Sequence, residues 1–198
     1  MGEIKSSWEL AMERTASIKS DKSALRASEL KEKGQKIASE YLSADKAEPK
    51  KLTQALKEYS GQEKKQVEKA VIEVLLTYIS LPRNGEYQSR LDFVSEGLKK
   101  VIGNAGIIEE ILQQISQFFS QYLEQREQLK EQLKQQYTPQ LRRKQQSLAQ
   151  QYGYEIELKH EQDPEFSQLL QKNLRHLEGQ YQEALNQVKD QLRNYHSP

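Results

Sequence analysis

The three histidines are the first residues of this chain that could hold a metal ion. His160, His176 and His196 lie sixteen and twenty residues apart, so none of them has the one-turn spacing of a helical zinc site. Glu157 and His160 form the Glu-x-x-His unit of carboxylate-bridged di-iron bundles, but that site needs a second copy of the unit. Asn173 stands where His176 would need its glutamate. We therefore expect no metal and no other cofactor.

Carboxylates are the next candidates for chemistry, as in the pairs Glu109–Glu110 and Glu155–Glu157. Two acids make an acid–base site only when burial forces their pKa values apart, and these pairs lie among polar residues. The chain has no cysteine, which excludes thiolate nucleophiles, thiolate metal sites and disulfides. We expect no enzymatic activity. An enzyme remains the alternative of another class and would need a concave site with convergent polar groups.

The charge balance bears on nucleic acids and membranes. Thirty basic residues nearly cancel 29 acidic ones, and the net charge of +1 gives no long-range attraction to polyanions. The local basic clusters, Lys99–Lys100 and Arg142–Arg143–Lys144, lack the interleaved aromatic residues that stack on bases. No apolar run approaches the roughly 20 residues of a membrane span. We expect a cytoplasmic protein without nucleic acid, and membrane contact only through a partner.

The only tryptophan lies near the N-terminus, on a helix that Ser6 and Glu9 would open as a capping box. Trp8, with Met12 one turn later, could dock on the chain's own bundle or anchor a protein partner, since tryptophan is enriched at interface hot spots. A membrane-surface anchor is a third possibility, weakened by the neighbouring glutamates. Trp8 and Met12 are candidate partner-binding residues.

Periodicity and capping signals predict helices throughout the first half of the chain. Residues 1–45 are expected to form amphipathic and charged helices, the second of them from Asp21 to Leu42. Residues 48–104 are expected to form a small helical bundle, in which Ser60 and Glu63 are a second capping box. Gly103–Asn104 should end one helix and cap the next, and the glutamine content rises sharply after it.

Residues 105–198 carry the pattern of a long antiparallel helical hairpin. Pro139 should kink or briefly break its outgoing helix, and Asp163–Pro164–Glu165 should cap the returning one. A tip loop is expected near 152–163, with a strand-like alternation that could pair with a second copy. The arm lengths place Tyr195 near Phe118. The outgoing seam consists of apolar residues and one arginine: Ile108, Leu112, Ile115, Phe119, Tyr122, Arg126, Leu129 and Leu133.

Apolar residues also lie off this seam. Ile111 and Phe118 on the outgoing helix, and Leu169 on the returning one, make the apolar stripe wider than one partner helix covers. We therefore expect a two-fold homodimer along the hairpins, with these three residues as further candidate partner-binding positions.

Two short motifs carry a family resemblance. Gly2-Glu3-Ile4-Lys5-Ser6, continued by residues 9–15, resembles the opening of a family of uncharacterised bacterial proteins of similar size, and Gln162–Phe166 resembles a further segment of that family. The resemblance implies a bacterial cytoplasmic protein and no particular activity.

The sequence thus predicts an all-α protein, a small helical bundle with a long coiled-coil-like hairpin. The expected function is a non-enzymatic protein–protein interaction module that acts as a scaffold, tether or chaperone-like adaptor. The alternative within the same architecture is a stalk-like subunit of a membrane-attached motor or export complex. That alternative rests on shape analogy alone.

Overall fold

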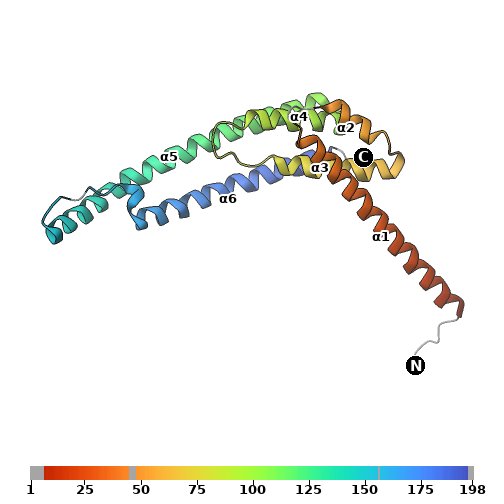
Figure 1. Cartoon of the computed structure of the whole chain (residues 1–198), viewed down its shortest axis with the longest axis horizontal. Helices are drawn as coiled ribbons and strands as arrows, with labels where there is room; N and C mark the ends of the chain where they lie inside the picture. The colour runs from red at the N-terminus through yellow and green to blue at the C-terminus, as the bar shows by residue number, and fades with distance from the viewer. Residues whose placement is uncertain (1–6, 45–47, 156, 196–198) are drawn as a thin grey trace. The chain divides into compact units, whose positions relative to one another are not determined.

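A computed structural model describes residues 7–44, 48–155 and 157–195, with side chains from residue 22 onward. The described residues form six α-helices, one short 3₁₀ helix and no strand, which confirms the predicted all-α fold (Figure 1). No helix in these ranges is long and apolar enough to cross a membrane. The elements are α1 (Ser7–Leu42), α2 (Pro49–Leu56), α3 (Gly61–Tyr78), α4 (Gln88–Ile102), α5 (Ala105–Tyr152), η1 (His160–Gln162) and α6 (Pro164–Asn194).

The chain divides into two compact units, each made of segments distant in sequence. The first contains Met1–Ile79, Asp92–Ile108 and Leu192–Pro198, and the second contains Ser80–Leu91 and Glu109–Gln191. The first turn of α5 and the last residues of α6 therefore belong to the first unit. The ranges 1–45, 48–104 and 105–198 expected from the sequence stay a prediction.

The first unit is built around the contact of α1 with α3. Gly34 faces α3 so closely that a Cβ at this position would lie 2.6 Å from the Cβ of Ala70. Tyr41 at the end of α1 donates a hydrogen bond to the carbonyl of Phe93 in α4. Buried apolar side chains fill the space between these helices, among them Leu30, Ala38, Val67, Val71, Leu75, Leu98 and Val101.

Two sequence predictions about this unit are wrong. The helices expected separately before and after Asp21 form one continuous helix, α1, since no glycine or proline interrupts the chain there. Ser60 occupies the N-cap of α3 but its hydroxyl makes no capping bond. The carboxylate of Glu63 instead forms an ion pair with Arg26 at 2.8 Å, so the expected capping box is absent.

The end of α4 is as predicted. Gly103 adopts the left-handed conformation, with φ of +81°, and its N–H donates to the carbonyl of Lys99. The side-chain oxygen of Asn104 accepts a hydrogen bond from the N–H of Ile107 in the first turn of α5. The two residues therefore stop one helix and start the next, as their chemistry requires.

The second unit is an antiparallel pairing of α5 with α6. The ring of Tyr181 lies 4.8 Å from that of Phe118 and 5.0 Å from that of Tyr122, and nearer the tip Phe166 lies 5.4 Å from Tyr137. The partner of Phe118 is thus Tyr181 and not Tyr195, which corrects the predicted register. The cause is the return segment, of which residues 153–155 and 157–163 are described. It runs back along the last turns of α5, where Gln145 donates to the carbonyl of Leu158 and Tyr137 donates to Asp163, before α6 begins.

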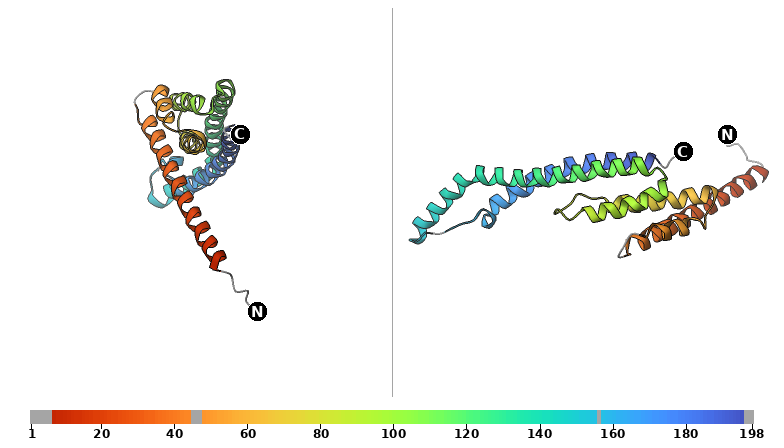
Figure 2. Two further views of the ribbon diagram at one scale, coloured as in Figure 1. Left: turned by 90° about the vertical axis from the view of Figure 1, so that its right-hand side faces the viewer. Right: turned by 90° about the horizontal axis from the view of Figure 1, so that it is seen from above.

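Pro139 does not break α5, which is helical from Ala105 to Tyr152. Proline removes one backbone hydrogen bond and clashes with the preceding turn. Where packing against neighbouring elements keeps the helix intact, these two effects bend it instead of ending it. Figure 2 shows α5 bending in its cyan section, the part that contains Pro139. The hydroxyl of Thr138 donates to the carbonyl of Lys134 beside this point.

Candidate functional site

Several polar side chains contact one another at the tip of the hairpin, where α6 begins. Asp163, directly before α6, is 2% exposed and is the only buried charged residue in the described chain. Its Oδ1 accepts the N–H of Glu165, which makes it the N-cap predicted from the sequence. Its Oδ2 accepts the hydroxyl of Tyr137 at 2.9 Å.

Lys144 completes this arrangement from α5. Its Nζ lies 2.8 Å from Oδ2 of Asp163, 2.8 Å from the carboxylate of Glu165 and 3.0 Å from the hydroxyl of Tyr137. We call these four residues, Tyr137, Lys144, Asp163 and Glu165, the tip network. Around it lies an apolar cluster of Leu133, Tyr137, Leu141 and Phe166. The network therefore fixes the start of α6 against α5.

The pKa values follow from these contacts. Burial alone raises the pKa of Asp163, but hydrogen bonds from Lys144, Tyr137 and the N–H of Glu165 outweigh it and hold the pKa below its usual value. Hydrogen bonds to Asp163, Glu165 and Tyr137 raise the pKa of Lys144. Burial raises the pKa of Tyr137. The carboxylates and the ammonium group are thus each stabilised in their charged forms, as in a structural ion pair.

His160 also belongs to the tip, as part of η1. Its Nε2 lies 3.1 Å from the hydroxyl of Thr138 and 3.1 Å from the carbonyl of Lys134, and its ring stands edge-on to Phe166 at 5.2 Å. The ring therefore helps to hold the return segment on α5. Within the described ranges no three histidine, aspartate or glutamate side chains gather as metal ligands would.

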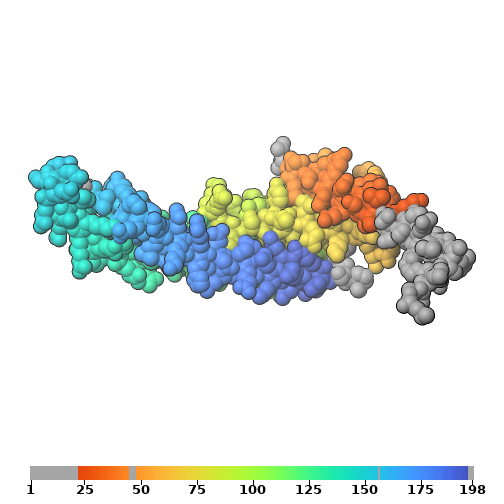
Figure 3. Space-filling model, turned by 90° about the horizontal axis from the view of Figure 1, so that it is seen from below, coloured from red at the N-terminus to blue at the C-terminus, as the bar shows by residue number. Residues whose placement is uncertain are grey.

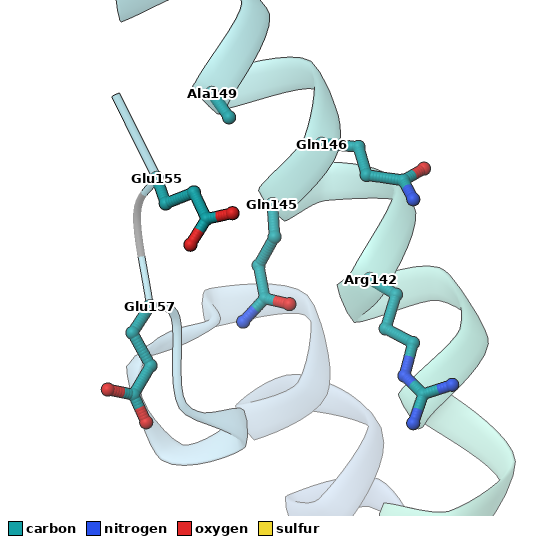
Figure 4. Close-up of a pocket in the computed structure, with 6 residues that line it drawn as sticks. All are labelled: Arg142, Gln145, Gln146, Ala149, Glu155 and Glu157. Carbon is teal, nitrogen blue, oxygen red and sulfur yellow. The ribbon is translucent and has the colours of Figure 1, made fainter. Parts of the chain in front are cut away.

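A hollow of about 560 Å³ lies between the return segment and the end of α5. In Figure 4 the carboxylate of Glu155 points toward Gln145, whereas the guanidinium group of Arg142 points away from both glutamates. Neither Glu155 nor Glu157 makes an ion pair with any described residue, although the neighbouring acids do: Glu161 binds Lys134, and Asp163 binds Lys144. The hollow thus has an acidic rim on the side of the return segment.

Two exposed tyrosines lie just before Glu155 in the sequence. Tyr152 is 56% exposed and Tyr154 is 64% exposed, with their ring centroids 6.3 Å apart. They flank Gly153, whose φ of +78° turns the chain at the end of α5. The tip therefore offers an aromatic pair and two free carboxylates on one short segment.

The residues predicted to bind a partner are placed as follows. Ile111 is 8% exposed. Phe118 packs on Tyr181, and Leu169 packs on the apolar cluster of the tip. Phe118 and Leu169 therefore contact their own hairpin, and Ile111 is buried. The three residues are not brought together, and their role in a dimer stays a prediction. The side chains of Trp8 and Met12 lie outside the described residues.

Sequence reasoning missed the partners of Asp163. In the sequence Lys144 is one of three basic residues in a run, but the structure separates it from Arg142 and Arg143, which are exposed. The only local signal was its spacing, since Tyr137 and Lys144 lie seven residues apart and hence on one helical face. The exposed pair Tyr152 and Tyr154 could be anticipated only as part of the expected tip loop.

Comparison with known proteins identifies the family but no function. Residues 53–194, more than two thirds of the chain, match the model of a family of unknown function, DUF6657, and the chain belongs to that family. No curated protein and no solved structure matches it. The match contains the segment Gln162–Phe166 and excludes the N-terminal motif that begins at Gly2.

Proposed function

We propose that this member of DUF6657 is a non-enzymatic interaction module that binds a protein partner through the tip of its hairpin. The observation that carries the proposal is the tip network. Burying a carboxylate is costly unless it is paired, and here the pair fastens Asp163, the last residue of the irregular segment, to α5. An irregular segment with exposed aromatic residues, anchored at its far end, is suited to recognition.

The exposed side chains of the tip indicate the chemistry of the partner. Tyrosine is enriched among interface hot spots because it buries a large area and keeps a hydroxyl for hydrogen bonding. Tyr152 and Tyr154 provide two such rings, and Glu155 and Glu157 provide carboxylates with no ion-pair partner among the described residues. A protein surface that presents arginine or lysine beside apolar groups would match both features.

The buried polar groups at the tip favour binding over catalysis. A general acid or base must reach a substrate, and its pKa must lie near the working pH. Lys144 and Asp163 are bonded to each other and to Tyr137, and their pKa values move away from neutrality in opposite directions. These contacts support a structural role for the pair. The absence of enzymatic activity itself stays a prediction.

The test is site-specific photo-crosslinking in native cells. A photoreactive phenylalanine analogue placed at Tyr154 should give a discrete crosslink to another protein. The same analogue at Gln132, an exposed residue of α5 away from the tip, is the matched control. The double variant Y152A/Y154A should lose the partner and keep its melting temperature, because both side chains are more than half exposed. Equal crosslinking at both positions, or unchanged partner binding by the double variant, would contradict the proposal.

A further inference from the structure

Two of the glycines inside helices are explained by contacts within the chain. A Cβ at Gly34 would lie 2.6 Å from the Cβ of Ala70, and a Cβ at Gly97 would lie 2.9 Å from the ring of Tyr41. Glycine is the least favourable helix residue after proline, so its presence in a helix interior calls for a reason. At both positions the reason is the close approach of a neighbouring helix.

No close contact with a described residue explains Gly179 in this way. It lies midway between Pro164 and Asn194 in α6, and a Cβ at this position would meet no atom within 4 Å. It is exposed, and its φ is not positive, so the backbone does not require glycine. Figure 3 shows that α6 has one face open along its length. The close contact that would explain Gly179 is therefore to be sought in another molecule.

The charges around Gly179 indicate which molecule this is. Arg175 lies four residues before Gly179 and Glu183 four residues after it, so the three lie on one face of α6. Both charged side chains are exposed, and neither is paired with a described residue. A two-fold axis through Gly179 would place Arg175 of each chain beside Glu183 of the other. The two charges are therefore self-complementary under two-fold symmetry, and a dimer would contain two Arg175–Glu183 ion pairs.

We propose that two copies of the chain associate through the outer face of α6, antiparallel to each other and crossing at Gly179. The missing Cβ lets the two helix backbones approach closely, and the Arg175–Glu183 pairs fix the register. This surface is distinct from Ile111, Phe118 and Leu169, the positions that the sequence suggested for self-association. The proposal does not depend on partner binding by the tip.

Sedimentation equilibrium of the full chain at tens of micromolar tests the contact, because ordinary weak dimers have micromolar affinity. The wild type should sediment above its monomer mass of 23.1 kDa, toward twice that value. G179A should weaken association at least tenfold and, since alanine favours the helix, raise the melting temperature by about 2–4 °C. The matched control is G106A, at an exposed glycine of α5 with equally open surroundings, which should leave association unchanged.

Charge exchange tests the register. R175E and E183R should each weaken association, whereas the double variant R175E/E183R should restore it, because the exchanged charges again face each other. Association should also weaken with rising salt. The tip variant Y152A/Y154A should remain a dimer, which separates this contact from the proposed function. A wild type that is monomeric, or a dimer that G179A does not weaken, would overturn the proposal.

Discussion

Asp163 acts twice at the start of α6. Its Oδ1 caps the helix locally through the N–H of Glu165, and its carboxylate forms the long-range ion pair with Lys144. The cap satisfies one of the N–H groups that every helix leaves unpaired at its start. The ion pair offsets the desolvation of a side chain that is only 2% exposed. The two roles can be separated by substitution.

Asp163→Asn keeps a capping oxygen but removes the charge, so it should lower the free energy of unfolding through loss of the ion pair alone. Asp163→Ala removes the cap as well and should lower it by about 1 kcal/mol more. Urea denaturation followed by circular dichroism measures both. Glu157→Gln, at an exposed carboxylate without an ion pair, is the control and should change stability by less than about 0.5 kcal/mol. Equal stability of the wild type and Asp163→Asn would show that the pair contributes nothing.

The same carboxylate should make the hairpin sensitive to acid. The folded-state pKa of Asp163 lies below its ordinary value of 3.8. Its contribution to stability is therefore fully present above pH 3.8 and is lost as the pH falls through the folded-state pKa. The stability difference between the wild type and Asp163→Asn should be constant near neutrality and shrink below pH 3.8. Urea titrations at a series of pH values give this difference, and a gap that widens in acid would contradict the assigned sign.

Local chemistry explains which of these features the sequence could predict. The cap at Asp163, the proline after it and the turn at Gly103–Asn104 depend on residues within one helical turn, and all three are confirmed. The partners Lys144 and Tyr137 come from another helix, and only the register of α5 against α6 brings them to Asp163. Periodicity does not encode that register.

At the scale of elements, two helices of the first unit approach closely at a position where glycine has no Cβ. The crossing of α1 with α3 leaves no space for a side chain at Gly34, because a Cβ would lie 2.6 Å from both the Cβ of Ala70 and the carbonyl oxygen of Val67. The backbone oxygen cannot turn aside as a flexible side chain could. The two helices would have to separate.

Gly34→Ala should therefore destabilise the first unit although alanine is the better helix former. Overpacking of this kind costs about 1–3 kcal/mol, and the gain in helix propensity offsets up to about 1 kcal/mol. The free energy of unfolding should fall, and Ala70→Gly in the same chain should recover part of the loss by removing one of the two close contacts. Gly106→Ala is the control without a neighbour within 4 Å. A stabilised Gly34→Ala protein would mean that the helices are farther apart than described.

The hairpin illustrates what periodicity can and cannot determine about paired helices. Seam residues at steps of three and four predicted both long helices, and most of the predicted seam of α5 is buried, including Ile108, Ile115 and Phe119. A repeating seam fits its partner at several offsets, however, since each shift by two turns again aligns apolar residues. The return segment and the ring contacts of Tyr181 select one offset. Neither is visible as a pattern in the sequence.

At the scale of the whole molecule, composition excluded more than it identified. The near-zero net charge gives no long-range attraction to polyanions, and the lack of cysteine excludes thiolate nucleophiles, thiolate metal sites and disulfides. No residue pattern indicates a particular partner. The family match covers α3 to α6 and leaves α1 outside, so it extends over the hairpin tip but not over Trp8 and Met12. The exposed residues of the tip, Tyr152 to Glu155 and Glu157, lie where α5 ends in an irregular segment, and the exposure of their side chains depends on tertiary structure.

The length of one element sets a lower limit to the size of the molecule in solution. At 1.5 Å per residue, the 48 residues of α5 extend about 72 Å before its bend is considered. A compact globule of 198 residues would have a radius of gyration of about 16 Å, and hence a diameter of roughly 40 Å. Small-angle scattering should therefore give a maximum dimension above about 60 Å. The measurement is best made on G179A at low concentration, where a dimer cannot lengthen the particle, and a maximum dimension near 40 Å would show that α5 does not form one long helix.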